Sequence, residues 1–271
     1  MISRSRFLIG QFRPGRGLLY KLDARTKIVA VLWVMVVSLM NTGPIFYGVL
    51  ICLLMTLLIS CRLGWRLILT NLKPVTWFIA FTALFHLIFS GREDSDIVLQ
   101  VWFLSVSRTA ATMAVVYSAR ILIFVLATFV LSLTTSPLTL SEAIVSLLKP
   151  LRWIKIPVYD LGMILFIALR FIPVLADEVE TIRKAQFIRG VTFTGSLWSR
   201  VRQSAALVLP IFFSALRRAD DLSVAIETRG YRSGRPRSSL YPLHFTGLDY
   251  AALVIVSAGA VLYMTGSRYL W

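Results

Sequence analysis

Arg189 and Arg229 stand in the same short pattern, an alanine followed by three residues and then an Arg-Gly pair. The two copies, forty positions apart, are Ala185-Gln186-Phe187-Ile188-Arg189-Gly190 and Ala225-Ile226-Glu227-Thr228-Arg229-Gly230. In a helix the i, i+4 spacing places the alanine and the arginine on one face, and glycine suits the left-handed residue that closes a helix. A guanidinium there can form charge-assisted hydrogen bonds with carboxylates or carbonyl oxygens, and glycine lets another backbone approach closely. The pattern predicts two helix ends that present arginines to an external partner.

Ordinary capping is the alternative explanation of each copy. An arginine near a helix C-terminus offsets the negative end of the helix dipole, and glycine closes many helices. Either copy alone would be explained equally well in this way. Capping has no need to repeat the alanine, so the duplication favours docking.

Two long helical segments must position these ends. They run from Val158 to Arg189 and from Leu197 to Arg229, and each is apolar in its first part and charged towards its end. Pro173 and Pro210 lie inside them, and a proline removes one helix hydrogen bond and introduces a kink. We expect two kinked arms that begin against a membrane domain and project into the cytoplasm, preceded by a short helix that starts near Ser136.

The two parts of each arm predict different surroundings. The charged part is expected to be solvated or interfacial, as at Glu180 and Arg183. The apolar part is expected to be buried against other helices. The residues that test this are Phe166, Leu169, Leu209 and Phe212.

The composition indicates an integral membrane protein, because hydrophobic residues make up 57% of the chain and the mean hydropathy is +0.76. The uncharged runs are residues 28–61, 74–91, 121–141 and 250–267. The first is broken by the turn signal Asn41-Thr42-Gly43-Pro44 and predicts a hairpin of two helices. This run is too short for two full spans, so helix tilt or interfacial residues must make up the difference. About five transmembrane helices are expected, with the fourth beginning near Thr109.

The distribution of charge predicts an orientation. The net charge of +16 arises from 29 Lys and Arg against 13 Asp and Glu. Basic residues precede the first span and follow the second and fourth, whereas the segment 92–96 after the third is net acidic. By the positive-inside rule the N-terminus and the arms are cytoplasmic, and five spans put the C-terminus outside. The basic charge is thus explained without nucleic acid, and the arginines from Arg229 to Arg237 can also touch anionic headgroups.

Residues suited to catalysis are few. His86 and His244 lack a second His or Cys at metal-ligand spacing, so core or interfacial positions are expected. Asp220-Asp221 has no second aspartate-rich motif that would hold Mg²⁺ and diphosphate, and no familiar catalytic motif occurs. Arg120 falls in the fourth predicted span, where a charge is costly and often functional, unless it lies near the interface. No catalytic residue, metal or cofactor is predicted.

Four features occur together in a fixed order. They are the two Arg-Gly helix ends, the stretch Ala168-Leu169-Arg170-Phe171-Ile172-Pro173, the run from Ala225 to Tyr231, and Tyr20-Lys21-Leu22-Asp23-Ala24-Arg25-Thr26-Lys27 before the first span. In order and spacing, from about Phe12 to the last span, they resemble the transmembrane T component of energy-coupling factor (ECF) transporters. That family usually has proline at Ala24, and often alanine where Ile188 and Thr228 precede the arginines. The Arg-Gly pairs are intact, so these departures concern packing and not the role.

The resemblance implies a coupling subunit of a four-part importer in the bacterial plasma membrane. Two cytoplasmic ABC-type ATPases would receive the tips, and a small S component in the same lipid bilayer would bind the vitamin or transition-metal ion. ATPase closure would shift the long helices and reorient the S component. The implied docking residues are Ala185, Gln186, Arg189, Gly190, Ala225, Glu227, Arg229, Gly230 and Tyr231, and the implied coupling or hinge residues are Arg170, Pro173 and Pro210.

The predicted fold is an all-α integral membrane protein, with about five transmembrane helices and long amphipathic cytoplasmic coupling helices in an L-shaped arrangement. Its parts are a basic N-terminal segment at 1–27, transmembrane helices at 28–133, the coupling region at 134–248, and the last transmembrane helix with the C-terminus at 249–271. Two other classes stay open. A stand-alone secondary transporter should show inverted repeats and mid-membrane ionisable groups, against which the odd span count and the polar arms argue. An integral membrane enzyme should show an acid-base or metal set, which the sequence does not offer.

Overall fold

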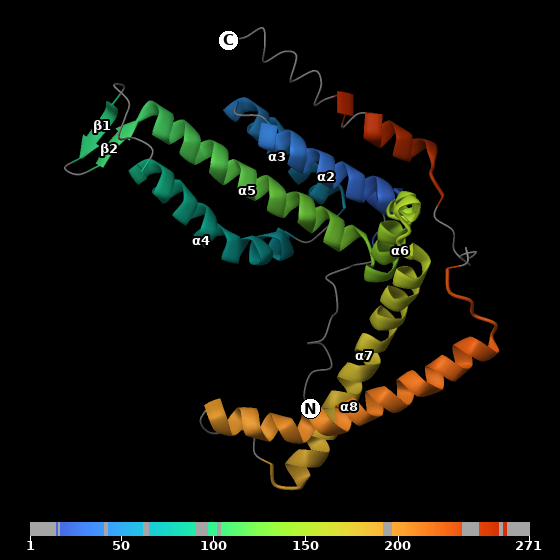
Figure 1. Ribbon diagram of the computed structural model, residues 1–271. Helices are drawn as coiled ribbons and strands as arrows, with labels where there is room; N and C mark the ends of the chain where they lie inside the picture. The colour runs from blue at the N-terminus through green and yellow to red at the C-terminus, as the bar shows by residue number, and fades with distance from the viewer. Residues whose placement is uncertain are drawn as a thin grey trace. The chain divides into compact units, whose positions relative to one another are not determined.

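A computed structural model describes residues 15, 17–40, 43–61, 65–89, 97–101, 104–191, 197–234, 244–254 and 257–258 (Figure 1). These residues fall into two compact units. The bundle unit contains the described residues of Gly10–Leu140 and Leu243–Trp271, and the arm unit contains those of Ser141–Pro242.

The bundle unit is built from helices and one short hairpin. In chain order its elements are α1 (Leu18–Lys21), α2 (Ala24–Met40), α3 (Pro44–Ser60), α4 (Trp65–Phe89), β1 (Ile97–Val101), β2 (Leu104–Ser107) and α5 (Arg108–Thr134), and residues 247–254 are helical again. Pro44 opens α3, where its missing N–H costs no helical hydrogen bond. Ser107 caps α5, because its hydroxyl accepts the N–H of Thr109 at 3.2 Å.

Helix α5 is the centre of the bundle unit and packs against α2, α3 and α4. Its buried side chains Ile123, Leu126, Ala127 and Val130 follow the i, i+3, i+4, i+7 spacing of one helical face. The core side chains that meet this face from α2 and α3 are Val37, Phe46, Tyr47, Leu54 and Leu58. The apolar periodicity of α5 therefore determines how the bundle is assembled.

Three described helical segments are long and apolar enough to cross a membrane, namely Leu72–Phe89 in α4, α5, and α7 (Val158–Ile188). The first two coincide with the third and fourth predicted spans. Helices α2 and α3 have 17 residues each, short of the about 20 that a span needs, as the length of the first uncharged run implied. The fifth predicted span lies mostly outside the described residues. The prediction of an all-α integral membrane protein is confirmed.

The β1–β2 pair adds a small antiparallel hairpin between α4 and α5 that the sequence analysis did not predict. Ile97 pairs with Ser107, and Val101 pairs with Leu104. The β-branched Ile97, Val98 and Val101 favour this extended backbone, and the strands are too short to alter the helical class.

Two helix starts in the bundle unit meet at Asp249, which is fully buried. Its Oδ1 accepts the backbone N–H of Asp23 at 2.8 Å, and its Oδ2 accepts the N–H and hydroxyl of Thr246 at 2.8 and 2.7 Å. Asp23 in turn caps α2, because its Oδ1 accepts the N–H of Arg25 at 2.9 Å. The N-terminal motif that precedes the first uncharged run is thereby anchored to the start of the last described helix.

The arm unit contains the later part of α6 (Pro137–Leu147), the 3₁₀ helix η1 (Lys149–Ile154), α7 (Val158–Ile188) and α8 (Leu197–Thr228). Both arms are helices within one residue of the predicted limits, and α6 is the short helix expected near Ser136. Gly162 lets α7 approach α6 closely, since a Cβ on it would lie 3.0 Å from Val145 Cγ1. The 3₁₀ helix was not predicted, and Pro150 stands at its start.

Candidate docking site at the two arm tips

The first tip closes α7 with a Schellman motif, in which the two residues after a helix bond back to its last turn. The N–H of Gly190 donates to the carbonyl oxygen of Phe187, and the N–H of Val191 donates to that of Gln186, both at 3.0 Å. Gly190 has a φ of 85°, a left-handed conformation that a side chain would strain. The preceding Arg189 is the C-cap of α7 and is exposed.

The second tip closes α8 with the same motif. The N–H of Gly230 donates to the carbonyl oxygen of Glu227 at 2.9 Å, and the N–H of Tyr231 donates to that of Ile226 at 3.1 Å. Gly230 has a φ of 73°, and Arg229 is exposed just before it. The left-handed glycine predicted from the duplicated pattern is confirmed at both tips.

The repeated alanines lie one turn before the arginines. The carbonyl oxygen of Ala185 accepts the N–H of Arg189 at 3.2 Å, and that of Ala225 accepts the hydroxyl of Thr228 at 3.1 Å. Both alanines are exposed, as a docking face requires. The docking role of these residues, and of Gln186, stays a prediction.

The two tips differ in the chemistry beside their arginines. Phe187 and Ile188 are 66% and 84% exposed at the first tip. Glu227 and Thr228 are exposed at the second, so that tip is polar. Because exposed large apolar side chains on a helix end often mark a contact surface, we expect unlike partner surfaces at the two tips.

Helices α7 and α8 cross within the arm unit (Figure 1). Polar side chains join the two helices at this crossing. Nη2 of Arg218 lies 3.1 Å from Oε2 of Glu178, and Oε1 of Glu178 accepts the hydroxyl of Ser214. The guanidinium of Arg218 also lies over the ring of Phe171, 5.9 Å from its centroid. The neighbouring apolar residues of the crossing are Ile167, Leu175, Ala215, Ala219 and Leu222. Sequence reasoning missed this ion pair, because nothing local links positions 178 and 218.

The expected burial of the apolar parts of the arms is wrong for the chain on its own. Phe166, Leu209 and Phe212 are 40%, 60% and 55% exposed, and Leu169 is half-buried. The arms pack on each other around their crossing, so side chains away from it keep their exposure. The apolar faces are therefore open to a further protein or to lipid.

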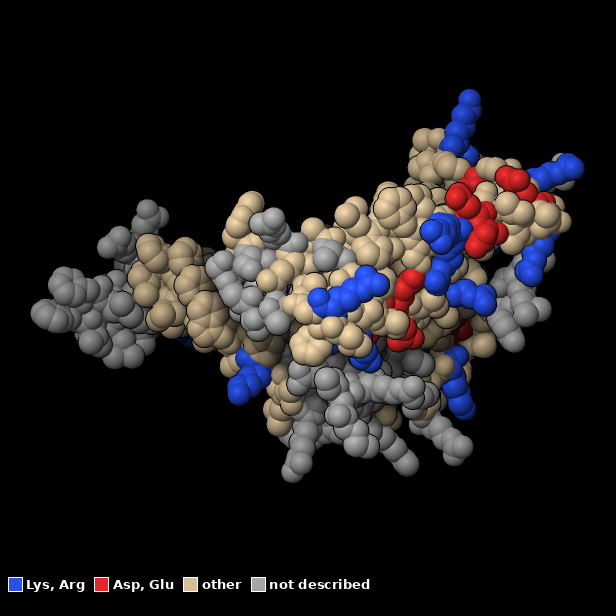
Figure 2. All heavy atoms as spheres, turned by 90° about the horizontal axis from the view of Figure 1, so that it is seen from below, with Lys and Arg blue, Asp and Glu red and all other residues tan. Residues whose placement is uncertain are grey.

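The charged parts of the arms are solvated as expected. Glu180 pairs with Lys184 at 3.0 Å while its side chain stays 42% exposed, and Arg183 is exposed. Figure 2, which looks from below in the view of Figure 1, shows acidic and basic side chains next to one another on this face. Because water screens an ion pair between solvated side chains, this pair contributes little to the stability of the arm.

The predicted hinge residues lie within continuous helices. Pro173 is inside α7 and Pro210 is inside α8, and neither ends its helix. Each removes one backbone N–H donor, which leaves one carbonyl in the preceding turn without its helical partner. Arg170 is exposed on α7, one turn before Pro173. Their hinge and coupling roles stay predictions.

Arg120 is held inside the bundle unit by neutral aromatic partners. Its Nη2 donates to the hydroxyl of Tyr47 at 3.0 Å, and its guanidinium lies 5.1 Å from the centroid of the Tyr117 ring. Tyr117 stacks on His86 with ring centroids 4.3 Å apart. Both Arg120 and His86 are half-buried and pack against aromatic rings, in line with the core or interfacial position expected for His86.

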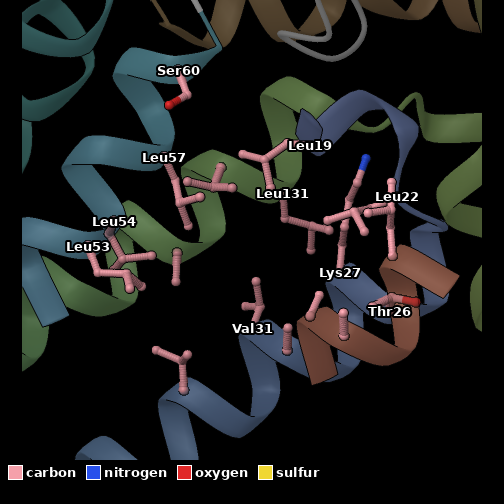
Figure 3. A pocket seen from close by; sticks show the side chains of 17 residues that line it. Leu19, Leu22, Thr26, Lys27, Val31, Leu53, Leu54, Leu57, Ser60 and Leu131 are labelled. Atoms are coloured by element: carbon pink, nitrogen blue, oxygen red, sulfur yellow. The ribbon is translucent and has the colours of Figure 1, made fainter. Parts of the chain in front are cut away.

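An apolar cavity of about 400 Å³ lies in the bundle unit between α2, α3, α5 and the segment 248–252. Figure 3 shows Leu54 and Leu57 on one side of it and Val31 on the other. The size falls within the about 300–1,000 Å³ of small-molecule sites, but the walls are mainly aliphatic. The ammonium of Lys27 at its wall already donates to the carbonyl oxygen of Thr134 at 3.1 Å. A polar or charged solute would therefore lose its hydration here with little in return.

Metal-binding clusters give no alternative site in the described part of the chain. No group of three or more His, Cys, Asp or Glu residues there could hold a metal ion. The features that stand out chemically are thus the two arginine tips and the contacts that position them.

Comparison with known proteins identifies a family whose match covers both tips and the arm crossing. The family described as "Cobalt transport protein" (CbiQ) matches residues 15–240. The chain belongs to the CbiQ family. The resemblance inferred from the Arg-Gly ends and the N-terminal motif is confirmed by this match.

Relatives of this CbiQ-family chain carry one shared name, "Energy-coupling factor transporter transmembrane protein EcfT". The protein of Limosilactobacillus fermentum is 39% identical over 261 residues, which cover 96% of this chain and 97% of the relative. That of Bacillus subtilis is 35% identical over 257 residues, covering 94% and 96%. That of Acidaminococcus fermentans is 36% identical over 258 residues, covering 92% and 95%. The chain is thus similar along almost its whole length to transmembrane proteins of bacterial transporters.

Proposed function

We propose that this chain is the coupling subunit, or T component, of an ATP-driven ECF-type importer for a vitamin or a transition-metal ion. Arg189 and Arg229 each dock on one of two cytoplasmic ABC-type ATPases. A small membrane S component binds the substrate and packs against the bundle unit and the apolar faces of the arms. Closure of the ATPases moves the tips, and the arms pass this movement to the S component.

The observation that carries this proposal is the pair of matching tips. Each tip is an exposed arginine followed by a left-handed glycine at the end of a long helix. A partner groove can take such an end without a side-chain clash from the glycine, and the guanidinium supplies several donors in fixed geometry. The repetition of this end on two helices favours docking over ordinary capping.

The open apolar faces of the arms support the proposed contact with the S component. Ile164, Val208 and Phe213 are 63%, 60% and 58% exposed, alongside the exposed residues Phe166, Leu209 and Phe212. Apolar side chains gathered on the same helices commonly mark a protein or membrane interface. The S component is the partner that this part of the proposal assigns to them.

Substitution of the tip arginines tests the proposal. We expect Arg189→Ala and Arg229→Ala each to weaken one ATPase contact by about 2–5 kcal/mol, because partner acceptors are left unpaired in a desolvated groove. The double variant should lose both ATPases during affinity purification of the complex from membranes. Ordinary capping predicts a loss of only about 0.3–1 kcal/mol of helix stability and an intact assembly.

Two nearby cations provide matched controls for this experiment. Lys184→Ala and Arg232→Ala remove exposed charges near the first and second tips without touching the Arg-Gly pairs. Both control variants should retain the ATPases. Full retention of both ATPases by the double Arg189→Ala, Arg229→Ala variant would reject docking through these residues.

Cysteine labelling tests the proposed orientation, with the N-terminus and the arms in the cytoplasm. In a background without Cys52 and Cys61, a cysteine at the exposed Thr181 should resist a membrane-impermeant maleimide in intact cells. A cysteine at Ser95, in the acidic segment after the third predicted span, should react. The opposite pattern would invert the topology.

A further inference from the structure

A single carboxylate, that of Asp160 in the first turn of α7, holds the segment that follows the second tip. Its Oδ1 accepts a hydrogen bond from the Tyr231 hydroxyl at 2.7 Å and from the Gly234 N–H at 3.2 Å. Its Oδ2 accepts the Ser233 hydroxyl at 2.6 Å. Three donors within four successive residues thus converge on one acid more than seventy positions earlier, and we call this arrangement the Asp160 clasp.

Backbone conformation shows that the segment turns back towards α7. Gly230 and Gly234 both have a left-handed φ, of 73° and 75°. The first ends α8, and the second turns the chain at Gly234, the residue whose N–H is the last of the three donors to Asp160. Figure 1 shows the chain beyond α8 running back towards the beginning of α7.

The clasp and the arm crossing together close a triangle within the arm unit. One side is α7 between Asp160 and Glu178, the second is α8 between Arg218 and its end, and the third is the short segment 229–234. At about 1.5 Å per residue the α7 side is about 27 Å long, and the α8 side is about 15 Å. Both helical sides are continuous, and Pro173 lies within the α7 side. For any given bend of α7 at Pro173, the angle between two sides is fixed while all three corners hold.

We propose that Asp160 is a positioning residue that fixes the angle at which the arms cross, and hence the separation of the two Arg-Gly tips. The proposal builds on the function assigned to the tips in the preceding subsection. The first tip is the covalent end of α7, and the second is bound through Asp160 to the other end of the same helix. Movement at either tip therefore acts on α7 as a whole.

A plain capping role for Asp160 makes a different prediction. An acid in the first turn of a helix interacts favourably with the helix dipole, and that effect needs only the charge. The double variant Tyr231→Phe, Ser233→Ala keeps the charge of Asp160 and removes two of the three donors that form the clasp. This variant therefore separates the effect of the clasp hydrogen bonds from the effect of the Asp160 charge on the helix dipole.

The experiment measures the distance between the arms in the full-length chain, in nanodiscs, by pulsed electron paramagnetic resonance. Spin labels are placed near the two tips at Lys184 and Val224, in a background without Cys52 and Cys61. The Lys184 side chain is 66% exposed, and Val224 is 61% exposed. The parent chain should give one narrow distance distribution. Asp160→Ala and the Tyr231→Phe, Ser233→Ala variant should each broaden it about twofold, because the freed arms sample several angles. Asp177→Ala, an exposed acid on the same helix, should leave it unchanged.

Each outcome of this experiment decides the question. Broadening in both clasp variants supports the proposal, and an unchanged width in either of them overturns it. Because the measurement needs no ATPase and no substrate, it does not depend on whether the tips dock. The docking proposal is refuted by a different result, in which the ATPases fail to co-purify with the unmodified chain.

Discussion

Glu178 of α7 and Arg218 of α8 form an ion pair across the arm crossing, with 3.1 Å between Oε2 and Nη2. The two side chains are 21% and 34% exposed, so water screens the pair only in part. Oε1 of Glu178 is occupied by the Ser214 hydroxyl, which leaves the carboxylate bonded through both oxygens. This pair holds one corner of the arm triangle.

Removal of either partner of that pair should lower the stability of the arm unit. We expect Glu178→Ala and Arg218→Ala each to cost about 1–3 kcal/mol, because each leaves a half-buried charge without its partner. In a double-mutant cycle of thermal unfolding in detergent, the coupling should be about 1 kcal/mol. The exposed Glu180–Lys184 pair on the same helix is the control and should show a clearly weaker coupling, because water screens it more fully. Strictly additive losses for Glu178 and Arg218 would contradict the role of their pair.

The two left-handed glycines predict a second set of stability changes. Gly190→Ala and Gly230→Ala should each cost about 1–2 kcal/mol, since a Cβ at φ of 85° or 73° meets the preceding carbonyl. Asparagine at the same positions should cost less, because it adopts this conformation more readily. Gly48→Ala is the control, since Gly48 lies inside α3 and an added Cβ would meet no atom within 4 Å. Equal melting temperatures for all three alanine variants would show that backbone strain at the tips is unimportant.

Local chemistry explains why the arms and tips could be predicted. A Schellman end is specified by an Arg-Gly pair and the turn before it. The long arms are specified by an apolar periodicity that continues until charged residues appear in the later part of each arm. The Asp160 clasp and the Glu178–Arg218 pair are different. Their members lie 71 and 40 residues apart, and no motif or period marks them. Only the folded chain brings them together.

Two other outcomes show where sequence reasoning stops. The spacing Thr246-x-x-Asp249 is that of a capping box, so a local signal for the start of the last described helix was present but not used. The exposure of Phe212 shows the reverse case. An apolar face predicts that another surface covers it. The sequence pattern does not distinguish a covering surface of the same chain from one of another molecule.

The buried Asp249 predicts a third change. Asp249→Asn keeps the shape of the side chain but turns an amide donor towards the N–H of Asp23 or the donors of Thr246. At least one buried donor is then left unpaired, and we expect a loss of about 1–3 kcal/mol in detergent unfolding. Asp221→Asn on the exposed face of α8 should change nothing measurable. A neutral effect of Asp249→Asn would mean that the two helix starts do not depend on this carboxylate.

The burial of Lys27 predicts that the stability of the folded chain depends on pH. It precedes the uncharged run that begins at Ile28, and it is buried with its ammonium on the carbonyl oxygen of Thr134. Burial lowers the pKa of Lys27 from 10.5 to about 8, against the opposing effects of a thiolate at Cys61 and the charges of Asp23 and Asp249. The folded chain therefore releases this proton at a lower pH than the unfolded chain does.

The sign of the effect follows from proton linkage. Between pH 8 and 10.5 the unfolded chain binds more protons at Lys27 than the folded chain, so this residue makes the free energy of unfolding rise with pH in that window. Below pH 8 both states are protonated at this site, and its contribution is constant. We expect the melting temperature of the unmodified chain, taken relative to Lys27→Met, to climb from pH 8 towards pH 10.5 and to be flat below it. Lys27→Arg, which stays charged throughout, should show no such climb against Lys27→Met. A difference that falls with pH in this window would mean that the folded chain stabilises the charged amine, and that burial does not dominate its environment.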